Sequence, residues 1–216
     1  MLFYPDRPAS PREALPTKLI LSVFQAVVCV FWWLSIIEHL KALAIFLSSR
    51  GAVGDQEKHL AARSIAIDLY EILKWLALAS FFVLGSASPL AVAVTAYLLA
   101  SNLFSHFYYH IWRDSPAAII THQQMQRRLT SFVLAFAFAI LAFGFVYYSI
   151  PSQISWPDNE VSIVNALYLS VANTFTLTYG DAGPASGDAR ALFVSQVVYA
   201  FVFVVMIIAK SLPSQN

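Results

Sequence analysis

The sequence predicts an all-α integral membrane protein with about five transmembrane helices. Hydrophobic residues make up 59% of its 216 residues and charged residues only 12%, a balance far from that of a soluble domain. Apolar runs of about 20 residues, the length needed to cross a bilayer, recur along the chain. A shorter apolar helix between the last two runs is too short to cross, so we expect it to enter and leave the membrane on the same side.

Composition also excludes several classes of function. The net charge is +1, so the chain lacks the basic face that a nucleic-acid-binding protein needs to neutralise phosphates. Its single cysteine, Cys29, lies in the first apolar run and forms no disulfide framework or metal-binding cluster. The sequence shows no nucleophile paired with a histidine, no H-E-x-x-H and no phosphate-binding glycine loop. We therefore expect neither an enzyme nor a cofactor.

The N-terminal half is predicted to hold three membrane helices. After an N-terminal segment, residues 1–17, a three-helix bundle occupies residues 18–112, with apolar runs at 18–48, 64–85 and 89–111. The first run is long for one crossing and too short for two at 1.5 Å per helical residue. We interpret it as a single tilted helix with a cytoplasmic extension.

Ionisable residues inside these three helices predict an intramembrane charge network, because charge in a bilayer is costly and is normally paired or functional. The network residues are Glu38, Lys41, Asp68, Glu71, Lys74, His106 and His110. One interpretation is a sensor that biases a gate, with the two histidines as proton or metal sites. The other is a structural network that holds the helices together. No third metal ligand is evident beside the histidines.

The C-terminal half divides into a linker and a domain of two long helices with a short helix between them. Residues 113–128 form a linker whose arginines place it in the cytoplasm by the positive-inside rule. Residues 129–212 follow as one domain, with an outer helix at 129–150, a short helix at 161–174 and a last helix at 190–211. Asp158 or Asn159 is positioned to cap the short helix. A polar segment, 176–181, interrupts the apolar sequence after it.

That polar segment resembles the pore loop of the tetrameric potassium channel superfamily, in which a pore helix precedes the selectivity filter T-V-G-Y-G-D. Here the filter reads T-L-T-Y-G-D, and the positions that match the family pattern are Thr176, Tyr179, Gly180, Asp181, Pro184 and Arg190. The resemblance implies a small bacterial-type channel with extra N-terminal transmembrane helices, located in the bacterial inner membrane. It also implies a homotetramer, because one chain supplies a quarter of such a pore.

The resemblance assigns roles to these residues. Backbone carbonyls would bind the permeant ion, K⁺ or Na⁺, along Thr176, Leu177, Thr178, Tyr179 and Gly180. Asp181, Pro184 and Arg190 would support the filter. Thr178 stands where the family has its first filter glycine, and a left-handed backbone is strained at a β-branched residue. A weakly selective cation channel, or a non-conducting membrane protein with an accessory role, is therefore an alternative to a potassium channel.

The last helix carries the candidate gate. Ala200 stands where many relatives have a hinge glycine, so we expect a stiffer helix. Phe201, Val204 and Ile208 recur at i, i+3 and i+7 and line either the lower pore, where apolar rings gate by dewetting, or the lipid. No helix repeats Arg or Lys at every third residue, so conventional voltage gating is not expected. Control by a ligand would come from a separate regulatory protein, lipid or the helices themselves.

Overall fold

The computed structural model describes residues 19–49, 56–85, 87–108, 122–157, 160–177 and 182–211. Almost all of them are helical, and three helices are long and apolar enough to cross a membrane. The chain is therefore an all-α membrane protein, as the sequence predicts. It divides into two compact units, Met1–Lys74 and Trp75–Asn216.

The first unit contains a sharp break where the sequence predicts one continuous helix. Helix α1, Leu19–Leu34, and helix α2, Ile36–Ser49, meet at Ser35 with a bend of 61°. The Ser35 N–H donates to the carbonyl of Trp32, and the Ser35 carbonyl accepts from the N–H of Glu38. The expected single tilted helix is thus a bent pair. Helix α3, Gln56–Val83, follows and continues into the second unit.

The candidate spans are fewer than the five that the sequence predicts. By length and composition they are Pro89–Phe107, Leu129–Ser149 and Gly187–Met206, with the bent pair α1–α2 as a fourth. Helix α3 is not among these candidates, because Asp68, Glu71 and Lys74 interrupt its apolar stretch. The fold class therefore holds, while the number of candidate spans within the described residues is three or four.

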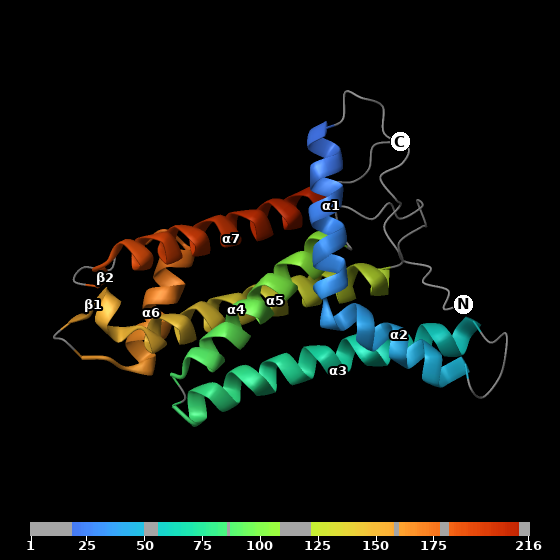
Figure 1. Cartoon of the computed structure of the whole chain (residues 1–216), viewed down its shortest axis with the longest axis horizontal. Helices are drawn as coiled ribbons and strands as arrows, with labels where there is room; N and C mark the ends of the chain where they lie inside the picture. Colours follow the sequence, from blue (N-terminus) through green and yellow to red (C-terminus); the bar gives the residue numbers. More distant parts are fainter. Residues whose placement is uncertain are drawn as a thin grey trace. The chain divides into compact units, whose positions relative to one another are not determined.

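The described part of the second unit packs four complete α-helices, the last part of α3, a 3-10 turn at Pro151–Gln153 and a small two-stranded ladder. Helices α4, Pro89–Phe107, α5, His122–Ser149, and α7, Gly187–Ser211, run beside one another. The shorter α6, Ile163–Thr174, packs between α5 and α7 near the end that carries β1, Ile154–Ser155, and β2, Gly183–Pro184 (Figure 1).

The helix bounds differ from the expected ones mainly at their starts. Helix α5 begins at residue 122, so the last seven residues of the expected linker 113–128 are helical, and α7 begins at 187 rather than 190. Serines cap the three helices α4, α6 and α7: an N–H of the first turn donates to the Oγ of Ser88, Ser162 or Ser186. The cap of α6 is thus Ser162, whereas the expected caps Asp158 and Asn159 lie outside the described residues.

Small residues bring α5 and α6 into close contact. Ala142 of α5 and Ala166 of α6 are completely buried. A Cβ added at Gly144 of α5 would lie 2.8 Å from Cδ2 of Leu167 in α6, closer than two carbon atoms can approach without moving. Gly144 therefore permits the close approach that seats α6 against the core.

Candidate functional site

The candidate site begins where α6 ends, because the polar segment starts there. The N–H of Thr176 donates to the carbonyl of Asn173 at 3.2 Å, and the N–H of Leu177 donates to the carbonyl of Ala172 at 2.8 Å. These two bonds form a Schellman motif, the common hydrogen-bonded end of an α-helix. The residue that turns the chain in such a motif adopts a left-handed conformation, and here Thr176 does so with a φ of 55°.

A left-handed threonine is strained. Glycine is the usual residue at this position, and a β-branched residue there costs on the order of 1–3 kcal/mol. The sequence predicts strain at Thr178, but Thr178, Tyr179, Gly180 and Asp181 lie outside the described residues. Within the described part of the chain, Thr176 is the non-glycine residue with positive φ. Thr176 is thus a strained residue that the sequence does not indicate, and strain at Thr178 stays a prediction.

The start of the polar segment is accessible in the single chain. Phe175, Thr176 and Leu177 are all exposed, and the Thr176 hydroxyl donates to the carbonyl of Phe175 at 2.7 Å. The C-terminal end of a helix carries a partial negative charge. This end of α6 therefore presents a negative electrostatic potential, which attracts cations, together with exposed oxygen atoms.

The chain leaving the polar segment is tied to the chain that enters α6. Strands β1 and β2 pair antiparallel, with Ile154 opposite Pro184 and Ser155 opposite Gly183. The N–H of Ala185 donates to the carbonyl of Gln153 at 2.9 Å. Pro184, a predicted support residue, is held by this ladder. Arg190, another, lies exposed in the first turn of α7.

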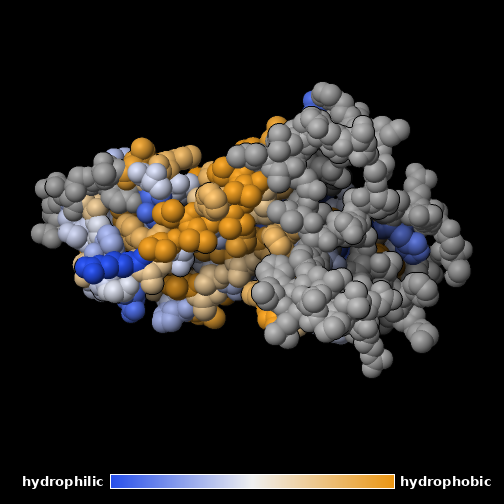
Figure 2. All heavy atoms as spheres, turned by 90° about the horizontal axis from the view of Figure 1, so that it is seen from above, coloured by the Kyte–Doolittle hydropathy of each residue, from blue (hydrophilic) through white to orange (hydrophobic). Residues whose placement is uncertain are grey.

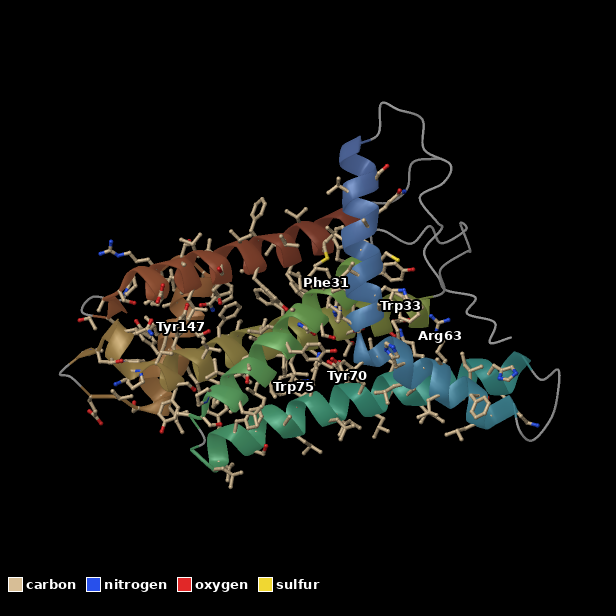
Figure 3. All side chains as sticks on the ribbon, in the orientation of Figure 1. Phe31, Trp33, Arg63, Tyr70, Trp75 and Tyr147 are labelled. Atoms are coloured by element: carbon tan, nitrogen blue, oxygen red, sulfur yellow. The ribbon has the colours of Figure 1, made fainter. Side chains whose placement is uncertain are left out.

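Behind the end of α6 lies a buried polar cluster that joins three helices, which we call the amide cluster. Its members are Tyr147 of α5, Ser170, Asn173 and Thr174 of α6, and Gln196 of α7. The Tyr147 hydroxyl donates to Oε1 of Gln196 at 2.5 Å, and Nδ2 of Asn173 donates to the same oxygen at 2.9 Å. Nε2 of Gln196, with two hydrogens to donate, lies 2.8–2.9 Å from three acceptors: the carbonyl and the hydroxyl of Ser170 and the Thr174 hydroxyl. Figure 3 labels Tyr147 within this region.

Asn173 and Gln196 are not among the site residues predicted from the sequence. One available signal is that Gln196 is an uncharged amide in an apolar helix, where a polar side chain without a partner is costly. Such a signal predicts a partner but does not say which helix provides it. The structure identifies the partners on α5 and α6.

A second polar cluster, the Asn102 cluster, joins α4 to the core through Asn102, His106 and Tyr199. Nδ2 of Asn102 donates to the Tyr199 hydroxyl at 2.9 Å and to the carbonyl of Ala135 at 3.0 Å. Nδ1 of His106 donates to the carbonyl of Asn102 at 2.9 Å, and its ring contacts Phe132 and Phe203. His106 is thus buried against aromatic rings, and His110 lies outside the described residues.

Two ion pairs occur among the residues of the predicted charge network, each within one helix. Glu38 and Lys41 form a buried pair of 2.9 Å within α2, and the half-buried Glu71 pairs with the buried Lys74 at 2.8 Å within α3. Asp68 is exposed. Among the described residues, no group of three His, Cys, Asp or Glu side chains is arranged to hold a metal ion. A connection that joins all three helices stays a prediction.

The predicted gate residues divide between two faces of α7. Ala200 is buried in the chain on the same side as Phe203, whereas Phe201 and Val204 are 67% and 45% exposed. Ile208 belongs to the helix, but its side chain lies outside the described residues. Figure 2 shows a largely hydrophobic surface on the side of the molecule where α7 lies. Ala200 therefore does not share a face with the exposed pair.

Comparison with known proteins adds one finding. Residues 135–212 match the model of an ion channel family. The match covers most of α5, the whole of α6, the polar segment and α7, which is less than half of the chain. Neither a curated protein nor a solved structure matches the chain. The match supports an ion channel built on the second unit and, with the apolar helices, an integral membrane protein.

Proposed function

We propose that four copies of the chain surround a passive cation pore that conducts potassium, with the carbonyls of Thr176 to Gly180 as ion ligands. One observation carries the proposal. The sequence T-L-T-Y-G-D begins at the C-terminal end of a short helix that packs between two candidate membrane spans, inside the segment that matches the ion channel family.

The position of the segment suits cation binding. An ion that leaves water needs oxygen ligands to replace its hydration shell, and successive backbone carbonyls around an axis provide them. The end of α6 adds a partial negative charge directed along the helix. The ladder between β1 and β2 joins the segment that follows the filter residues to the segment before α6, which holds Pro184 in place.

An uncovered face of α6 supports assembly into a homotetramer. The apolar side chains exposed on this helix and its cap are Val164, Tyr168, Val171 and Phe175. They recur at i, i+4, i+7 and i+11, the spacing of a single helical face. A polar loop at membrane depth must be buried in protein or line a water-filled path. Neighbouring copies arranged around an axis fulfil both requirements, because they cover the face and enclose the loop.

A vesicle assay tests this proposal. The purified protein is reconstituted into liposomes loaded with potassium chloride, and potassium efflux is measured beside a Gly180→Ala variant that forms the same oligomer. We expect rapid efflux through the native protein and little through the variant, because a Cβ at this position restricts the filter backbone. No efflux from a native tetramer would instead favour the non-conducting alternative.

A further inference from the structure

The amide cluster uses almost all of the hydrogen-bonding capacity of its members. Gln196 has two Nε2 hydrogens, and three oxygens lie within 2.9 Å of that nitrogen. Its Oε1 accepts from both Tyr147 and Asn173, and both its side chain and that of Tyr147 are almost completely buried. The Ser170 hydroxyl also donates to the carbonyl of Ile140 in α5 at 2.6 Å. Such a saturated buried network holds its members in one arrangement.

These bonds converge on the last turn of α6. Nδ2 of Asn173, with two hydrogens to donate, lies 2.9–3.0 Å from three acceptors: the carbonyl of Phe193 in α7, the Tyr147 hydroxyl and Oε1 of Gln196. The Asn173 carbonyl accepts from the N–H of Thr176 in the Schellman motif. One residue thus takes part in both the cluster and the turn into the polar segment. A rotation of this turn would move Thr176 directly.

We propose that the amide cluster determines ion selectivity by positioning the end of α6, with Tyr147, Asn173, Thr174 and Gln196 as positioning residues. This inference rests on the proposed channel function. It adds the residues that fix the position of the end of α6, where the filter begins. In an assembly with rotational symmetry, a shift of α6 in one copy is repeated in every copy. A small displacement of Thr176 therefore changes a complete ring of ligands.

Two matched pairs of conservative variants test the inference. Tyr147→Phe removes one hydroxyl from the amide cluster, whereas Tyr199→Phe removes a buried hydroxyl that also bonds an amide but lies in the Asn102 cluster. Thr174→Val and Thr95→Val each remove a hydroxyl that bonds the carbonyl four residues earlier at 2.8 Å. Of these two threonines, Thr174 is the one that accepts from Gln196.

The measurement is the ratio of potassium to sodium permeability, obtained from reversal potentials in planar bilayers. We expect Tyr147→Phe and Thr174→Val to lower the ratio by about tenfold, the equivalent of roughly 1.4 kcal/mol. Tyr199→Phe and Thr95→Val are expected to keep the native ratio, because neither hydroxyl belongs to the amide cluster.

Three results would overturn the inference. The first is an unchanged permeability ratio in both cluster variants when the native channel is selective for potassium. That result would leave the proposed channel function intact. The second is an equal change in the control variants, which would assign the effect to any lost buried hydroxyl. The third is a failure of both cluster variants to form the native oligomer while the controls do so, since the cluster would then serve assembly alone. Absence of current in the native protein would remove the proposed function together with this inference.

Discussion

The two buried polar clusters of the second unit are built from similar parts but join different elements. In each, a tyrosine hydroxyl bonds a buried amide, and α7 provides one partner. The Asn102 cluster connects α7 and α5 to α4, a helix outside the segment that matches the ion channel family. The amide cluster connects three helices that all belong to that segment and lies against the turn at Thr176. We therefore expect the Asn102 cluster to attach an additional helix and the amide cluster to position the candidate filter.

The largest expected effect comes from Gln196→Leu, which removes the centre of the amide cluster. The change leaves Tyr147, Ser170, Asn173 and Thr174 without one of their bonds, and a buried polar group left unsatisfied costs about 1–3 kcal/mol. We expect a marked fall in the melting temperature of the detergent-solubilised oligomer. An unchanged melting temperature would show that the cluster contributes little to the stability of the assembly.

A smaller effect is expected from Asn102→Leu in the other cluster. Here the Tyr199 hydroxyl and the Ala135 carbonyl each lose a partner, and interhelical hydrogen bonds in membrane proteins contribute about 0.6 kcal/mol each on average. Thermal unfolding should shift modestly, and the permeability ratio should stay native. A loss of ion selectivity in Asn102→Leu would contradict the separation of roles between the two clusters.

The smallest expected effect is that of Gly144→Ala, which tests packing beside the amide cluster rather than its hydrogen bonds. The new methyl group would meet Cδ2 of Leu167 at 2.8 Å, and because this side-chain end can move aside we expect a cost of about 1 kcal/mol, the lower limit for overpacking. The double variant Gly144→Ala with Leu167→Ala removes the clash. We therefore expect the fall in melting temperature of the double variant to be smaller than the sum of the falls in the two single variants. A fall equal to that sum would show that the two side chains do not clash.

The sequence predicts the helices of the C-terminal part better than those of the N-terminal part, for physical reasons. Helices α5 and α7 are long apolar runs, and the short α6 lies between recognisable breaks in hydropathy, so their existence follows from composition. The break at Ser35 has no such signal, because residues 19–49 contain neither proline nor glycine. The predicted span at 64–85 contains Asp68, Glu71 and Lys74, and with these three charges α3 is not among the candidate spans.

Local geometry at the site was less accessible to sequence reasoning. The left-handed conformation of Thr176 depends on where α6 ends, and helix ends are uncertain by a few residues when read from sequence. The partners of Gln196 lie 22 to 49 residues away along the chain. No periodic pattern relates residues on three different helices, so this cluster emerged only from their packing.

The most direct test of the proposed function is the reversal potential of the native protein in planar bilayers, with potassium on one side and sodium on the other. Thr178→Gly, which restores the glycine of the related filters, is measured beside it. The account predicts a reversal potential near that of potassium in the native protein. A reversal near zero would contradict potassium selectivity, and its recovery in Thr178→Gly would assign the loss to Thr178; no current from either protein would contradict a channel.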